Sequence, residues 1–286
     1  MSNESLIRTA VVQDFYPGDC ISQIRDFISE FKDLENLPAE LIGAVVPHAG
    51  WRYSGRTAAR TLYCLSKRSK PEICVVFGSN HIGVSKHSIL PVGLWDTPLG
   101  EIPIAEKVCE TILHSLPKLI DVEVEAHNRE HSIEVLAPMI KYFFPNIQLI
   151  PIIVRSELDS MALGKRIMTI IQEIGISTIY LASTDLTHYG KLYGFAPGGL
   201  GQLGLQWMRS NDLRMIRFME SCDSQGVLTE ARKSLNACGS GAVAAMIEIV
   251  KNQRKKRGFL VEYTTSFRDA SAAEFLYGVG YAGVVY

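Results

Sequence analysis

Apolar residues follow two patterns along this chain. In some segments they form runs typical of β-strands, and in others they recur every three or four residues. The first pattern predicts strands over 41–47, 73–78, 147–154, 178–183, 259–265 and 275–285. The second predicts helices over 19–34, 56–66, 104–116, 132–144, 158–174, 205–219 and 242–256. The first four strands are nearly continuous Val, Ile and Leu runs, as expected for strands covered on both faces.

Strand and helix patterns alternate along the whole chain, with no low-complexity linker and no internal repeat. Such alternation is typical of an α/β fold. We therefore expect a single α/β domain over residues 1–286, with a central, largely buried mixed sheet and helices on both faces. Glycine and proline gather at 196–204, which predicts a surface loop before a helix.

Composition and charge narrow the class of protein. The 286 residues are 47% hydrophobic and 21% charged, which excludes disordered, collagen-like and coiled-coil proteins. Lys and Arg total 29 against 30 Asp and Glu, so no overall field attracts nucleic acid or an anionic membrane. The sequence also has no apolar run of membrane-spanning length and no amino-terminal signal core. We expect a cytoplasmic protein with no nucleic-acid or membrane partner and a small-molecule or peptide ligand; its oligomeric state stays open.

Three of the seven histidines directly follow predicted buried strands. His48 lies in PHAG, His81 in GSNH and His188 in STDLTH. In an open α/β sheet, ligands bind outside the carboxyl ends of the strands. Imidazoles placed there suit metal ligation or proton transfer, whereas any one of them alone could simply satisfy loop backbone groups. Three at strand ends favour a shared site; His87 and His114 lie in polar contexts and receive no role.

The segment 127–134, HNREHSIE, carries two histidines and two glutamates just before an apolar helix. It lacks the H-E-x-x-H spacing of zinc proteases. Glu130 could orient a histidine or pair with Arg129, and Glu130 and Glu134 would share one helical face. A capped, salt-bridged helix start explains the same residues, so both interpretations stay open.

Cys238 differs from the other cysteines in its surroundings. The six cysteines are scattered without a C-x-x-C pair, which argues against a disulfide framework or a zinc knuckle. Cys238 precedes the apolar run AVAAMIEIV, so its sulfur would sit at a helix amino terminus, where the dipole favours thiolate. It is either a small packed residue or a functional thiolate. With His48 and His81 it would form a two-imidazole, one-thiolate set able to hold Fe, Cu or Zn with open positions.

A series of longer strings then points to a known family. The chain contains, in order, VPHAGWRYSGRTAAR, FGSNH, DTPLG, REHSIEVLAP, STDLTHYG, NACG and SAAEFLYGVGYAGVVY. In this order and spacing it resembles the Memo family, also called protein B of the AmmeMemoRadiSam system, over nearly its whole length. The resemblance implies a fold similar to class III extradiol dioxygenases, a central sheet with helices on both faces.

The resemblance also implies a metal site. In those dioxygenases two histidines and a carboxylate hold non-haem Fe(II), and in the Memo family a cysteine takes the place of the carboxylate. The matching positions are His48, His81 and Cys238, with Fe(II) as the first expected cofactor and Cu or Zn as alternatives. Two departures from the family pattern concern pocket shape: 15–17 reads Phe-Tyr-Pro rather than Trp-Tyr, and no proline follows NACG.

The resemblance also implies that Asp185 and His188 line the same pocket, with His131 as an additional pocket residue. The first functional hypothesis is a redox metalloenzyme, similar to a dioxygenase, in which His188 acts as acid or base and Asp185 holds its tautomer. The resemblance also implies a redox role; a vertebrate member of that family binds phosphotyrosine peptides, a property that is not assumed for this chain.

Two other classes of function remain open. The chain could be a non-catalytic module that binds a peptide or an anionic ligand through Arg52, Tyr53 and Arg56. Alternatively, Cys238 could be a nucleophile with His188 as base and Asp185 as orienting group. The sequence does not identify a substrate.

Overall fold

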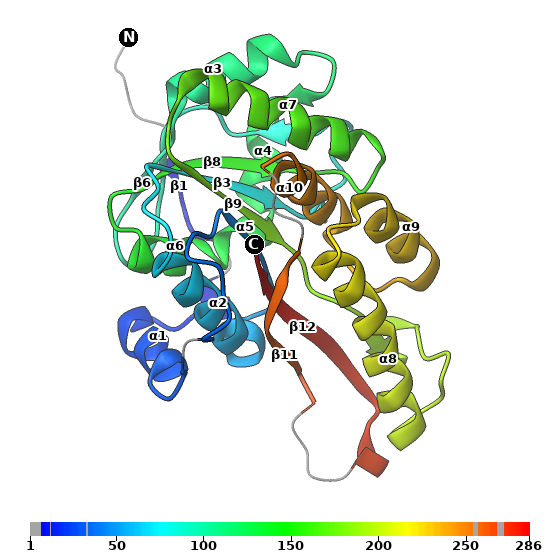
Figure 1. The fold of residues 1–286 in the computed structure, drawn as a ribbon. Helices are drawn as coiled ribbons and strands as arrows, with labels where there is room; N and C mark the ends of the chain where they lie inside the picture. The colour runs from blue at the N-terminus through cyan, green and yellow to red at the C-terminus, as the bar shows by residue number, and fades with distance from the viewer. Residues whose placement is uncertain (1–6, 12, 33, 254–256, 268–271) are drawn as a thin grey trace.

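The computed structural model describes residues 7–11, 13–32, 34–253, 257–267 and 272–286 (Figure 1). Its main sheet has nine strands among these residues. They are Gly43–Val46 (β2), Ile73–Gly78 (β3), His87–Ile89 (β4), Ile120–Asp121 (β7), Gln148–Ile153 (β8), Thr178–Ser183 (β9), His188–Gly190 (β10), Phe259–Thr265 (β11) and Tyr277–Val285 (β12).

The centre of the sheet is parallel and its edges are mixed. Strands β2, β9, β3 and β8 pair in that order, all parallel. Antiparallel β12 and β10 extend one edge, where β11 also pairs with β12, and β4 and β7 extend the other. The buried apolar runs form the parallel core, as their continuous hydrophobicity predicts. The expected mixed sheet is therefore confirmed.

Helices cover both faces of this sheet (Figure 1). Helix α10 packs on β9, β3 and β2 and contacts α7, whereas α2 packs on β2, β11 and β12 and contacts α1 and α6. The main helices are Cys20–Ile28 (α1), Arg56–Ser66 (α2), Glu106–Ser115 (α3), Val124–Arg129 (α4), His131–Glu134 (α5), Ala137–Phe143 (α6), Asp159–Ile174 (α7), Gly201–Glu220 (α8), Ser224–Ser234 (α9) and Ser240–Asn252 (α10). This arrangement confirms the predicted α/β fold class.

Several predicted elements need correction. The helix expected over 132–144 is two helices, α5 and α6, because Pro138 has no N–H to continue the hydrogen-bond ladder and lies instead in the first turn of α6. The helix expected over 19–34 ends at Ile28, since only Cys20 and Ile24 are buried on it and Ile21 is 40% exposed. Helix α8 begins inside the loop predicted at 196–204.

Other elements gave no clear pattern in the sequence. Helices α4 and α9 were not predicted, nor was a small separate sheet of Ile7–Arg8 (β1), Leu94–Trp95 (β5) and Ile102–Pro103 (β6). The helix predicted over 242–256 is α10, and residues 254–256 lie outside the described part of the chain.

One main hydrophobic core runs from Tyr16 to Tyr286, so residues near both ends of the chain pack together. Within the described residues, no helix is both long and apolar enough to cross a membrane. The parallel strands end in step: Val46 pairs with Ser183, and Phe77 with Ala182. Their carboxyl ends therefore open onto one edge, where the loops carrying the predicted histidines meet.

Candidate metal centre

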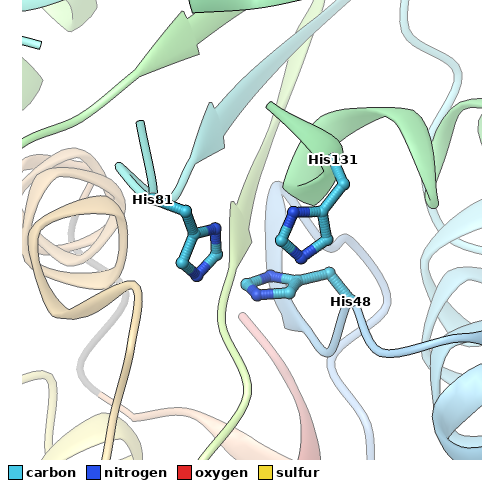
Figure 2. Close-up of side chains that lie close together, drawn as sticks. All are labelled: His48, His81 and His131. Carbon is cyan, nitrogen blue, oxygen red and sulfur yellow. The ribbon is translucent and has the colours of Figure 1, made fainter. Parts of the chain in front are cut away.

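Three imidazoles face one another at this edge (Figure 2). His48 follows β2, His81 follows β3, and His131 begins α5. One ligand nitrogen from each lies within 4.8 Å of the other two. The ring centroids are 5.3 Å apart for His48 and His81, and 4.7 Å apart for the stacked His81 and His131. These three residues are called the imidazole cluster below.

The hydrogen bonds of His48 determine its tautomer. Its Nδ1 lies 2.7 Å from Ser183 Oγ, and that hydroxyl donates its only proton to the carbonyl oxygen of Ser132 at 2.7 Å. Nδ1 must therefore carry a proton, and Nε2 presents a lone pair. Burial, together with the neighbouring imidazoles His81, His131 and His188, holds the pKa of His48 well below its ordinary value. His48 is thus neutral and able to ligate.

A buried carboxylate orients His81. Glu130 Oε1 lies 2.9 Å from His81 Nδ1, and Oε2 accepts the backbone N–H of His81 at 2.8 Å. Burial lowers the pKa of His81, but Cys238 and Glu130 outweigh burial and raise it to about 10. Burial raises the pKa of Glu130, but its bonds to His81 and to backbone amides lower it to about 2. A carboxylate on one ring nitrogen is the usual support of a metal-binding histidine.

His131 completes the imidazole cluster from α5. Its ring stacks on His81, and the ring of Phe15 approaches it edge-on at 5.5 Å. Its Nδ1 lies 3.5 Å from Glu130 Oε1. Burial and the charge of His81 lower its pKa. The sequence predicted His131 as an additional pocket residue; the structure brings it as close to His81 as His48 is.

Cys238 lies against the same cluster. Its Sγ is 3.3 Å from His48 Nε2, the nitrogen with the lone pair, and it accepts the backbone N–H of Asp185 at 3.3 Å. Gly239 makes this approach possible, because a Cβ there would lie 2.1 Å from the carbonyl oxygen of Ser183. Loss of the thiol proton would leave sulfur and nitrogen as adjacent ligand atoms.

Asp185 and His188 occupy different positions around the site. The buried Asp185 carboxylate accepts the backbone N–H groups of His48 at 2.8 Å and Ala49 at 3.2 Å, so it fixes the turn that carries His48. Burial raises the pKa of Asp185 to about 7, against those hydrogen bonds and the charge of His81. His188, with a pKa lowered by burial, lines a cavity of about 400 Å³ together with Asp185 and His131. This space is called the metal cavity below.

Sequence reasoning missed a buried arginine behind the site. Arg8 is 1% exposed and donates to the carbonyl oxygens of His127 at 3.2 Å and Glu130 at 3.1 Å. Its Nη1 also lies 2.6 Å from Glu134 Oε2. Arg8 thereby braces the segment that supplies Glu130 and His131. Arg8 lies in a short amino-terminal strand, and no pattern in the sequence there indicated a role at the site.

His87, which received no role from its polar context in the sequence, is more buried than that context suggested. The side chain is fully buried on β4, and its Nδ1 accepts the backbone N–H of Arg155 at 3.1 Å. Its Nε2 lies 3.2 Å from Asp159 Oδ1 at the start of α7. These contacts are structural and lie apart from the imidazole cluster. By contrast, Tyr53 lines the metal cavity, as the anionic-ligand hypothesis required, and Arg56 lines a second cavity beside it.

Known proteins are similar to this chain over nearly its whole length. A MEMO1 family protein of Pyrococcus furiosus is 35% identical over 98% of this chain and 99% of its own. One from Methanopyrus kandleri is 30% identical over 97% of each chain. A solved structure of an uncharacterized protein from Escherichia coli K12 aligns with 13% identity and a TM-score of 0.47, over 86% of this chain and 99% of that one. The family model described as Memo-like protein matches residues 8–285. The chain therefore belongs to the Memo family.

Proposed function

We propose that this protein binds one transition-metal ion at the imidazole cluster and is a metal-dependent redox protein. The observation that carries the proposal is the convergence of His48, His81 and His131, whose ligand nitrogens lie within 4.8 Å of one another. Nδ1 of both His48 and His81 is engaged by another protein group, which directs their Nε2 atoms to the cluster. Histidines that only satisfied loop backbone would not need this arrangement.

His48 and His81 belong to both possible ligand sets, the one completed by Cys238 and the one completed by His131. We propose Cys238 as the third donor, because its sulfur lies 3.3 Å from His48 Nε2. His131 offers a further nitrogen within 4.8 Å of those of His48 and His81. Two imidazoles and a thiolate suit Fe(II), with Cu or Zn as alternatives. Bound iron or copper would supply one-electron chemistry and a binding position for dioxygen.

The surrounding side chains would hold the substrate and handle protons. His188 is neutral and lines the metal cavity, so its ring can accept a proton from a bound compound. The ring of Tyr193 packs edge-on against it, 5.1 Å between centroids, and restrains its orientation. Aromatic side chains including Phe15, Tyr53 and Tyr281 line the cavity and offer an apolar surface to a bound compound.

The contacts of Cys238 favour metal ligation over a nucleophilic triad. The imidazole next to its sulfur is His48 rather than His188. The Asp185 carboxylate is engaged by backbone N–H groups of His48 and Ala49, which leaves it placed to fix a turn rather than to orient a catalytic base.

Dioxygen consumption by the Fe(II)-loaded protein tests the redox proposal. We expect consumption faster than that of free Fe(II) at equal concentration, because open coordination positions and a thiolate donor favour reaction with dioxygen. The His48→Ala variant, treated identically, should fall to the free-iron rate. A site that takes up only Zn, or equal rates in wild type and variant, would contradict a redox role.

A further inference from the structure

A second cavity adjoins the metal cavity and is lined by two arginines. It has a volume of about 560 Å³, and its walls include Tyr53, Arg56, Arg209 and Tyr263. Arg56 comes from the first turn of α2, and Arg209 comes from α8. Elements that are distant in sequence thus bring two guanidinium groups to one hollow, called the arginine cavity below.

Within the described part of the chain, the neighbours of this cavity only partly neutralise its charge. Arg56 pairs with Glu262, whose Oε1 lies 2.6 Å from Arg60 Nη1 but 3.6 Å from Arg56 Nη2. Arg60 is therefore the main partner of Glu262, and the Arg56 side chain stays 52% exposed. Arg209 has no ion pair among the residues that the structure describes. Two guanidinium groups without full compensation favour an oxyanion, which they can bind through paired N–H donors.

The arginine cavity and the metal cavity share a wall. Tyr53 lines both, and the consecutive residues Thr265 and Ser266 line one each. The metal cavity has an apolar, aromatic lining with His188 and His131 at its polar side. The two cavities therefore meet at Tyr53, with an aromatic space on one side and two arginines on the other.

We propose that Arg56 and Arg209 form an anion-binding subsite for the compound that occupies the metal cavity, so that the substrate is a small molecule with an apolar body and a carboxylate or phosphate group. This inference rests on the proposed function for the role of the metal cavity. Binding of the anionic group itself depends on the two arginines and not on a metal.

Calorimetric titration with three matched probes tests the subsite. The probes are 3-phenylpropionate, 2-phenylethyl phosphate and the neutral 3-phenylpropanamide. Wild type should bind at least one of the two anions at least tenfold more tightly than the amide, and added salt should weaken that binding. The anion bound more tightly identifies whether the subsite takes carboxylate or phosphate. Equal binding of amide and anions, or no measurable binding of either anion, would overturn the proposal.

Variants then locate the binding. The double variant Arg56→Gln, Arg209→Gln should bind the preferred anion at least tenfold more weakly than wild type. Arg217→Gln is the matched control, because it removes the same charge from an exposed position of α8 outside the cavity. It should change binding less than twofold; equal losses in the control and the double variant would contradict the assignment.

A third comparison separates this inference from the metal proposal. The His48→Ala variant should lose metal but keep its preference for anion over amide. The double arginine variant should keep wild-type metal content by elemental analysis. If wild type holds no metal and the anion preference still depends on Arg56 and Arg209, the proposed function fails while the subsite stands.

Discussion

The carboxylate of Glu130 supports the imidazole cluster through several contacts. Oε1 meets His81 Nδ1 and the backbone N–H of Ser132, each at 2.9 Å, while Oε2 accepts the backbone N–H of His81. From the sequence, two interpretations of Glu130 were equally open: that it orients a histidine, or that it caps the start of a helix. The structure shows that one side chain does both, because Glu130 also caps α5.

Glu130→Gln tests this support at the level of one functional group. The amide keeps the size of the side chain but cannot accept at both atoms, so His81 loses its fixed tautomer. We expect metal affinity to fall by about 10- to 100-fold, the usual effect of removing a residue that orients a ligand. Competition with a chelator measures the affinity. Glu173→Gln, an exposed change on α7, is the control, and unchanged affinity in Glu130→Gln would refute the role.

Asp212 provides a pH-dependent prediction away from the imidazole cluster. Burial raises its pKa to about 7, against hydrogen bonds from Thr187 and Tyr263. The folded protein therefore holds a proton that the unfolded chain releases near pH 4, so Asp212 lowers the free energy of unfolding as pH rises from about 4 to about 7.

Asp212→Asn should remove this dependence. Relative to the variant, wild type should lose up to about 1.4 kcal/mol of unfolding free energy per pH unit in that window. Urea unfolding at pH 4, 5, 6 and 7 measures both profiles. Parallel profiles would show that Asp212 titrates alike in the folded and unfolded states.

At the level of elements, the sequence predicted best where one pattern decided the outcome. The buried strands β3 and β9 and the amphipathic helix α2 have the predicted bounds, because burial alone selects their residues. The break between α5 and α6 depends on Pro138, but the apolar pattern continues across this residue. The prediction followed that pattern and therefore gave one helix. Short strands such as β1 depend on partners distant in sequence, which no local pattern encodes.

Strand β1 is nonetheless important, because Arg8 ties it to the segment around α5. Arg8→Met would remove the cation that lies 2.6 Å from Glu134 Oε2, at a place where Arg8 and Glu134 are each 1% exposed. We expect a loss of about 3–5 kcal/mol in the free energy of unfolding, measured with denaturant.

An exposed ion pair gives the comparison. Arg232 and Glu157 lie 3.2 Å apart with side chains 72% and 48% exposed, so Arg232→Met should cost no more than about 1 kcal/mol. A similarly small loss in Arg8→Met would mean that the buried pair adds no net stability to this region.

At the scale of the whole molecule, the site is assembled where parallel strands end together. That rule predicted His48 and His81 from the sequence, because both follow buried strands. The approach of Cys238 to His48 joins residues 190 positions apart. The sequence offered this set as one possibility beside a small packed cysteine, and the family resemblance then favoured it. His131 was expected in the pocket from the family resemblance. Its closeness to His81 and the bracing by Arg8 arise from packing of the 127–134 segment, which no local pattern specifies.

The central claim is that the imidazole cluster and Cys238 bind one metal ion. Its most direct test is elemental analysis of protein purified anaerobically, with and without added Fe(II), for wild type and for His48→Ala, His81→Ala, Cys238→Ala and His131→Ala. We predict about one equivalent of iron or copper in wild type, lost in the first three variants and reduced less in the fourth. Wild type that stays metal-free with added Fe(II), or variants that retain the full equivalent, would contradict this account.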